Sequence, residues 1–425
     1  MSISSKERLP LPPRRARQRC RYFRPARPGC LPRGRGGGPS VTFFQALGME
    51  ALNNVLALHL LHAAVMEQAQ VDALPLPPAP YQPRARRNRD DPFTLSDKEF
   101  KQNFRFNKDS VRRLADLLQL RDRRSRRGRP LSAHQQLCLA LHHFGSKNFI
   151  RSTANCGKVS YSAAWYAINR VRNALVQIAP RFIRLPTDVE ATATAERMLQ
   201  KHGLPGFAYA IDGMIVFFDQ KVKGIPRGAG LPNQQNFFTR KGRYGINTMI
   251  IANDQKLIHA LDAEWHGAVH DARVWRLSLV RPLIEARPQF LLAGDSGYPI
   301  SEVLMKPFDP REVRNDRRKT RFNRHLSGLR TRMSENVFAD LKNRWQCLKD
   351  LRCHYMHAKK TILACAVLHN LSILWSDDFD FADAHPEHQQ PPPVDAPPAE
   401  VHAVPAEVRR RGQERRDQLL AQMRR

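Results

Sequence analysis

Residues 207–218 read FAYAIDGMIVFF, a run that is almost entirely apolar, β-branched or aromatic. Similar runs follow at 244–253 and 256–265, and turn-forming residues separate the three. Runs of this length and composition between turns predict consecutive β-strands. A fourth run at 290–298 ends in a turn bounded by glycine, and helical patterns lie between and after the strands. This order predicts an α/β fold with a mixed sheet.

Four acidic residues stand at the ends of these elements. Asp212 lies near the end of the first strand, Asp295 ends the fourth, Asp271 begins a helix, and Glu335 lies in a helix predicted over 330–345. Open α/β sheets place their sites at the carboxyl ends of strands, and carboxylates there can bind Mg²⁺. Each acid also has a structural explanation, because aspartates turn chains and cap helices, and Glu335 is able to pair with a neighbouring arginine. The residues alone leave both interpretations open.

The chain is strongly basic. Its 425 residues include 70 Lys and Arg against 39 Asp and Glu, a net charge of +31. Such a charge favours polyanionic partners, meaning nucleic acid or an anionic membrane surface. No uncharged apolar run reaches the roughly 18 residues of a transmembrane helix, so a membrane-spanning protein is not predicted. Seven scattered cysteines favour a reducing compartment, and the sequence has no glycine-rich nucleotide-binding loop.

Residues 93–180 show helical periodicity. The patterns predict, among others, helices at 132–144, 150–155 and 160–178. Three short helices of this kind predict a helix-turn-helix-like, DNA-binding region that precedes the sheet. Many three-helix units do not contact DNA, so the role of these helices stays open.

Both ends of the chain differ from this middle region. Residues 1–92 are predicted to be a mostly disordered extension with a basic arm, one helix at 44–70 and a proline-rich linker. The first 40 residues hold eleven Lys and Arg, which also fits an organelle transit peptide or a later start at Met49. Residues 376–425 are predicted to be an acidic, proline-rich and disordered tail that ends in a basic segment able to form a helix.

Two basic clusters are candidates for binding DNA phosphates. One is the loop RKGRYG at 240–245, and the other is the segment 311–332, which has nine basic and two acidic residues. A solvated loop explains each cluster about equally well. The candidate phosphate-binding residues are Arg240, Lys241, Arg243, Arg317, Arg318 and Lys319.

A zinc site is a weaker alternative. Cys347, Cys353, His354 and His357 lie close together in the sequence, but their spacing does not match a zinc motif. His266 and His270 are four residues apart without a predicted helix between them, so they are candidates for lining the acidic site instead.

Six sequence blocks occur in an order that resembles the PIF/Harbinger transposase superfamily, and more narrowly its domesticated, transposase-derived nucleases. The blocks are AIDG (210–213), NFFTRKGRYGINTMIIAN (236–253), WHGAVHDARVW (265–275), LAGDSGYP (292–299), ENVFADLKNRWQCL (335–348) and ILACAVLHNL (362–371). Each block alone is a weak signal, but six in the family's order are specific. The resemblance extends over about residues 95–375.

The resemblance implies an RNase H-like nuclease domain over 181–375 with a DD-E catalytic arrangement. Asp212, Asp295 and Glu335 match the three catalytic acids, and Asp271 matches a further acid that the family uses as a metal ligand. The family's chemistry is hydrolysis of DNA phosphodiester bonds with two Mg²⁺ or Mn²⁺ ions. The resemblance also implies a Myb/SANT-like partner protein. A nuclear location, with the cytoplasm as a second compartment, is predicted from arginine runs such as RDRRSRRGRP at 121–130. The resemblance implies no particular oligomeric state.

The chain departs from the family pattern at two places. The residues after AIDG lack the usual His and early Pro, and Ser334 and Asn336 flank Glu335 where a basic residue often follows. The presence of all four acids favours a metal-dependent nuclease. The altered neighbours favour a catalytically silent DNA-binding or chromatin adaptor, and an active transposase is a third interpretation.

Overall fold

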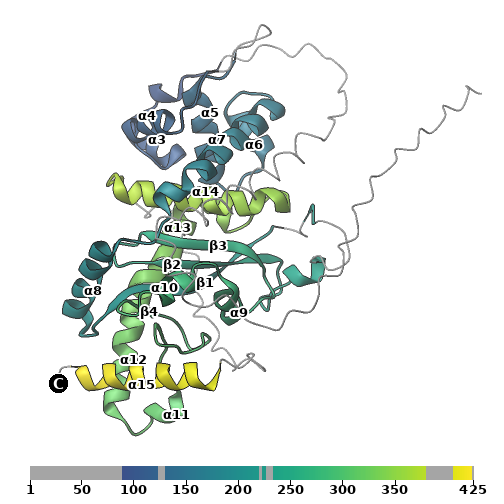
Figure 1. The fold of residues 1–425 in the computed structure, drawn as a ribbon. Helices are drawn as coiled ribbons and strands as arrows, with labels where there is room; N and C mark the ends of the chain where they lie inside the picture. The colour runs from purple at the N-terminus through teal and green to yellow at the C-terminus, as the bar shows by residue number, and fades with distance from the viewer. Residues whose placement is uncertain (1–88, 123–129, 220–222, 226–232, 380–404, 424–425) are drawn as a thin grey trace, which may run out of the picture. The chain divides into compact units, whose positions relative to one another are not determined.

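The computed structural model describes residues 89–122, 130–219, 223–225, 233–379 and 405–423 (Figure 1). All of them belong to one unit of the chain, Leu47–Arg425. The predicted basic arm, the helix at 44–70 and its proline-rich linker lie outside the described residues, as do residues 380–404 of the predicted tail. None of the described helices is long and apolar enough to cross a membrane.

A five-stranded mixed sheet forms the centre of the described region. Its strands are β1 (Phe207–Phe217), β2 (Gly245–Ala252), β3 (Ile258–His266), β4 (Leu291–Ala293) and β5 (Leu304–Met305). Their order in the sheet is β3-β2-β1-β4-β5, in which β2 is antiparallel to both β1 and β3, and β4 is parallel to both β1 and β5. This confirms the mixed sheet and the first four strands, although β4 is shorter than its apolar run. Nothing in the sequence predicts β5, because two residues are too few to show a periodicity.

The region upstream of the sheet is helical, which the sequence patterns predict for residues 93–180 but not for the helix at Asp188–His202. Its helices are α3 (Asp97–Phe104), α4 (Lys108–Leu117), α5 (Ala133–Phe144), α6 (Ile150–Cys156), α7 (Tyr161–Phe182) and α8 (Asp188–His202). Ser96 and Ser132 begin α3 and α5 with capping boxes, which satisfy backbone amides at the helix starts. Helices α5, α6 and α7 pack against one another, while their role as a helix-turn-helix stays a prediction.

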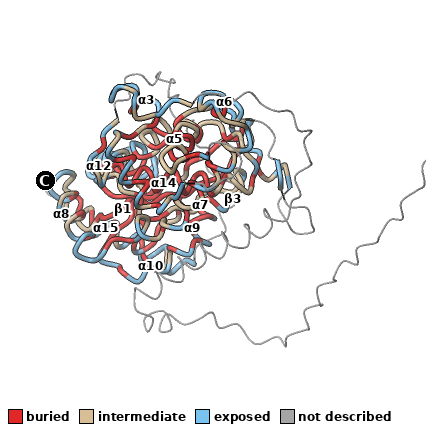
Figure 2. Tube along the Cα trace, turned by 90° about the horizontal axis from the view of Figure 1, so that it is seen from above, coloured by how far each residue is buried: buried red, intermediate tan, exposed pale blue. Residues whose placement is uncertain are grey.

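Helix α14 (Tyr355–Leu374) joins the helical region to the sheet. It lies between α7 and β3 (Figure 1). Most of its residues are buried (Figure 2), as expected for a largely apolar helix that has neighbours on two sides. One continuous hydrophobic cluster therefore contains side chains of the upstream helices, of the sheet, of α13 (Asn336–Arg344) and of α14.

A second hydrophobic cluster covers the opposite face of β1 and β2. Side chains alternate along a strand, so Met214 and Val216 pack toward α13 and α14, whereas Ile211 packs toward α9 (Asp271–Leu277) and α10 (Arg281–Glu285). The fully buried Trp275 of α9 anchors this second face. The alternation also applies to Asp212 and Gly213, which point to opposite faces of the sheet.

The basic segment 311–332 is helical and not a solvated loop. It contains α11 (Pro310–Val313) and α12 (Arg317–Arg330), and α12 buries Phe322, Leu326 and Leu329 in a third hydrophobic cluster. The buried face explains the order of this segment, because apolar residues recur at helical spacing between its arginines. In the predicted basic tail, α15 (Ala406–Gln422) forms and contacts α12 and β5.

Candidate active site

Three of the four predicted acids meet at one edge of the sheet. Asp212 lies in β1, and Asp295 lies two residues beyond the end of the neighbouring, parallel β4. Parallel strands that lie side by side end at the same edge, so the chain brings these aspartates together there. Glu335 is the last residue of a π-helical turn, Thr331–Glu335, which connects α12 to α13.

One arginine contacts all three carboxylates. Nη2 of Arg330 is 2.7 Å from Oε1 of Glu335, and Nη1 is 3.8 Å from Oδ2 of Asp212 and 4.0 Å from Oδ2 of Asp295. The guanidinium therefore lies at the centre of a cluster built by a strand, a loop and a helix junction. The sequence does not single out Arg330, because it is one of nine basic residues in the segment 311–332.

The π-helical turn positions two members of this cluster. A π-turn adds one residue to the helical turn, so that Arg330 and Glu335, five positions apart, can meet; such turns are frequent at functional sites. Ser334 is fully buried within it, and its Oγ donates to the Arg330 carbonyl at 2.8 Å and lies 3.4 Å from Oδ2 of Asp212. At this departure from the family pattern, the chain thus places a small polar side chain against the first acid.

Burial raises the pKa of Asp212 to about 7, and the charges of Asp295 and Asp271 act in the same direction. Arg330 and the Gly213 amide oppose this rise because they stabilise the ionised carboxylate. Burial and then the same carboxylates raise the pKa of the Tyr298 phenol, whose hydroxyl has no hydrogen-bond partner among the described residues. Apart from the place of Tyr298 in the block LAGDSGYP, the sequence does not indicate that its phenol lies near these carboxylates. The site therefore concentrates negative charge in buried surroundings, a setting that favours a cation.

Asp271 approaches the sheet from the opposite face. It is the first residue of α9, and its Oδ1 accepts a hydrogen bond from Nδ2 of Asn247 at 2.6 Å. Asn247 also donates to the Val269 carbonyl at 2.8 Å, which fixes the loop before α9. The Asp271 carboxylate fills the space beside Gly213, where an added Cβ would lie 2.4 Å from Oδ1. The structure thus brings Asp212, Asp295 and Glu335 around Arg330, and it places Asp271 beside Asn247 and Gly213.

Replacing Gly213 with alanine is expected to lower the free energy of unfolding by about 1–3 kcal/mol, because the new methyl group would overlap the Asp271 carboxylate. Urea-induced unfolding followed by circular dichroism measures this change. Gly328→Ala is the matched control: this glycine lies inside α12, and its added Cβ would meet only His202, at 3.6 Å. That substitution should raise the stability by roughly 0.5–1 kcal/mol. Equal effects at the two positions would contradict the packing at Gly213.

The donor set suits a hard divalent cation such as Mg²⁺ or Mn²⁺. Such ions take carboxylate oxygens, and three of the four acids already surround a positive charge. Within the described ranges, no three His, Cys, Asp or Glu side chains form a ready metal site as they stand. At the acidic cluster, the Arg330 guanidinium contacts all three carboxylates.

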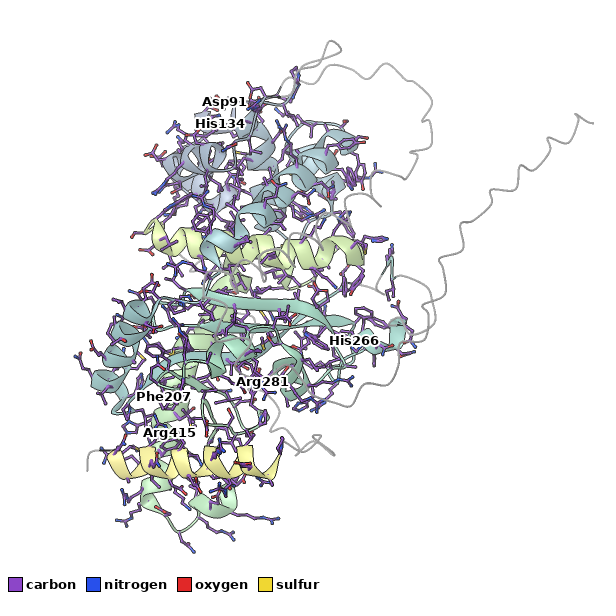
Figure 3. The ribbon with its side chains drawn as sticks, in the orientation of Figure 1. Asp91, His134, Phe207, His266, Arg281 and Arg415 are labelled. Atoms are coloured by element: carbon purple, nitrogen blue, oxygen red, sulfur yellow. The ribbon has the colours of Figure 1, made fainter. Side chains whose placement is uncertain are left out.

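The histidines and cysteines that were considered for a zinc site or for the lining of the acidic site make contacts of other kinds. His270 caps α9 through its Nδ1, which accepts from the Ala272 amide at 3.3 Å, and its ring lies near the backbone of Gly297 in the Asp295 turn. His266 is the last residue of β3 (Figure 3). Cys347 packs in the core with its Sγ 3.9 Å from that of Cys365, and Nδ1 of His357 lies 2.7 Å from Nη2 of Arg172. The predicted zinc alternative is therefore not assembled among the described residues.

The candidate phosphate-binding residues lie on two separate elements. Arg240 and Lys241 are exposed in the turn before β2, whereas Arg243 pairs with Asp350 and lies over the ring of Phe217. The remaining candidates, Arg317, Arg318 and Lys319, form the first turn of α12. Arg318 donates to the Leu420 carbonyl at 3.0 Å, so it also contributes to the contact with α15. Contact of these residues with DNA stays a prediction.

The mixed sheet and the three converging acids are consistent with a DDE-type nuclease domain. Residues 211–370 match the family described as DDE superfamily endonuclease, and this range contains all four predicted acids. The resemblance inferred from the sequence is thereby confirmed: residues 211–370 are similar to the DDE superfamily endonuclease domain.

Several curated proteins that are similar to the chain are named as nucleases. The proteins named "Putative nuclease HARBI1" from Bos taurus and Homo sapiens are each 26% identical to the chain over 279 residues, which is 64% of this chain and 76% of the relative. The protein of that name from Rattus norvegicus is 25% identical over 280 residues, with the same coverage. No solved structure matches the chain.

Proposed function

We propose that this protein is a transposase-derived, divalent-metal-dependent nuclease that hydrolyses DNA phosphodiester bonds through an RNase H-like domain over residues 181–375. The observation that carries the proposal is that Asp212, Asp295 and Glu335 converge on one side chain, that of Arg330, at the edge of the sheet. The DDE superfamily endonuclease match supports the same reaction class.

Asp212, Asp295 and Glu335 would hold the ions, with Asp271 as a further ligand. Bound Mg²⁺ or Mn²⁺ supplies a water of lowered pKa and neutralises charge on the leaving oxygen. The chain's part is to fix the carboxylates. The Gly213 amide donates to Oδ1 of Asp212 at 2.8 Å, and the Gly297 amide donates to Oδ1 of Asp295 at 3.0 Å. Each aspartate is thus anchored through its Oδ1, and its Oδ2 faces the Arg330 guanidinium.

DNA is the proposed substrate because the chain carries a net charge of +31 and exposes basic residues on two elements of the nuclease domain. The helices of residues 93–180 are proposed to add a helix-turn-helix-like contact. A nuclear location is a further proposal that rests on arginine runs such as the one at 121–130, and a Myb/SANT-like partner is a proposal that rests on the family resemblance alone.

Plasmid cleavage tests the proposed activity. The full-length chain is incubated with supercoiled plasmid in Mg²⁺, in Mn²⁺ or in EDTA. Nicked or linear DNA that forms only with metal supports the proposal. If a folded protein leaves the plasmid uncut yet binds it equally with and without divalent ions, the adaptor function is favoured. Repeating that assay with a Myb/SANT-like protein decides whether a partner was missing.

The double substitution Arg240→Gln, Lys241→Gln is expected to weaken DNA binding about equally for all sequences, because these exposed cations are proposed to contact phosphates. It should also reduce the slope of log K against log salt concentration by roughly 2. Fluorescence anisotropy of a labelled duplex at several salt concentrations measures both effects. Arg281→Gln on α10 (Figure 3) is the control, because it removes a positive charge outside this turn. An unchanged slope in the double variant would exclude this loop from phosphate contact.

A further inference from the structure

The proposed metal ligands already share a cation that belongs to the chain itself. Only 20% of the Arg330 side chain is exposed, and it reaches carboxylates from β1, from the loop after β4 and from the π-helical turn. These three acids are far apart in the sequence, so the guanidinium holds together parts of the chain that would otherwise present like charges to one another. Removing Arg330 would leave these carboxylates, of which Asp212 is the most buried, without the counter-charge that they share.

In Asp212 and Asp295, the oxygen that faces Arg330 is not the one that accepts a hydrogen bond from a backbone amide. Oδ1 of Asp212 and Oδ1 of Asp295 each accept a hydrogen bond from a glycine amide. Arg330 is directed instead toward Oδ2 of both residues. A divalent ion bound by these aspartates would therefore need the same oxygen atoms that now face the guanidinium.

A divalent ion and the Arg330 guanidinium would repel each other if both bound these oxygens. Two like charges about 4 Å apart repel each other strongly at the effective dielectric near a protein surface, and a doubly charged ion increases this repulsion. The positive charge of Arg330 must therefore move away when an ion binds between the same carboxylates.

We propose that Arg330 is an internal counter-cation that competes with the divalent ion, so that metal binding requires its side chain to leave the acidic cluster. This inference rests on the proposed function, because it takes these acids to be the metal ligands. Only the side chain has to move. The Arg330 carbonyl is held by Oγ of Ser334 at 2.8 Å, which keeps the helix junction in place while the flexible side chain swings outward.

Calorimetric titration of the full-length chain with MnCl₂ tests this competition. Arg330→Gln is expected to bind Mn²⁺ at least about tenfold more tightly than the wild type, because the ion no longer displaces a charged partner. Arg330→Lys keeps a positive charge on a shorter side chain that lacks the forked guanidinium, so its Mn²⁺ affinity should lie between the two. Thermal unfolding in EDTA gives a second readout: Arg330→Gln should melt below the wild type and gain more from saturating Mn²⁺. Arg332→Gln, an exposed arginine on the same turn, is the control and should match the wild type.

The outcomes separate this inference from the proposed function. If the wild type binds Mn²⁺ and Arg330→Gln binds it equally or less tightly, the competition is overturned while the nuclease proposal stands. If neither protein binds Mn²⁺ although both are folded, both proposals are overturned. If Arg330→Gln does not fold, Arg330→Lys decides, and an Mn²⁺ affinity no higher than that of the wild type would overturn the competition.

Discussion

Replacing Asp295 with asparagine is expected to lower the rate of metal-dependent plasmid cleavage by about 10³-fold or more. Asparagine has nearly the same shape, and its oxygen can still accept from the Gly297 amide, as Oδ1 of Asp295 does at 3.0 Å. The substitution removes the negative charge at the position that faces Arg330 at 4.0 Å, which is the position assigned to the metal. Mn²⁺ affinity should therefore fall together with the cleavage rate, while the fold is retained.

Asp340→Asn is the matched control for this prediction. Asp340 lies on α13, and its Oδ2 pairs with Nζ of Lys256 at 2.7 Å, a partly exposed ion pair. Pairs of this kind contribute at most about 1 kcal/mol, so the variant should cleave at close to the wild-type rate. Wild-type cleavage by Asp295→Asn would show that the acidic cluster is not the active site. Loss of activity in both variants, with loss of the folded circular dichroism signal, would indicate unfolding rather than catalysis.

The sheet and its acids could be predicted because their signals are local. The runs that form β1, β2 and β3 are apolar and bounded by turns, and each became a strand within two residues of its expected ends. Asp212 and Asp295 were recognisable because each stands where such a run meets a glycine. These observations need no knowledge of which strands are neighbours.

The centre of the site could not be predicted, because it depends on distant contacts. Arg330 is chemically the same as the other arginines of its segment, and only the π-helical turn and the packing of α12 direct it toward the acids. Asn247 reads as a polar interruption of a strand, and its bond to Asp271 follows from the strand face on which it lies. The same alternation of faces explains why Asp271 reaches β1 from the side of Gly213, while Asp212 faces Arg330.

Replacing Asp377 with alanine is expected to lower the free energy of unfolding by about 3–5 kcal/mol, because it leaves a buried arginine without its counter-charge. The Asp377 side chain is fully buried although the residue lies in the segment predicted as a disordered tail. Its Oδ1 is 3.1 Å from Nζ of Lys101 and 3.7 Å from Nη2 of Arg344, and its Oδ2 accepts from the Asn107 amide at 2.9 Å. Burial lowers the pKa of Arg344 to about 10, and Asp377 is the chief charge that opposes this. Urea-induced unfolding measures the loss.

Asp378→Ala provides the control, since this neighbouring acid is exposed and its removal should change stability by no more than about 0.5 kcal/mol. A similarly small effect at Asp377 would contradict the buried ion pairs. The three partners of Asp377 belong to three different helices: Lys101 lies in α3, Asn107 caps α4, and Arg344 ends α13. One carboxylate after α14 therefore ties the upstream helices to the helix that begins beside Glu335. A chain that ends before Asp377 should lose the same contacts and, like Asp377→Ala, should unfold at lower urea concentration than the full-length protein.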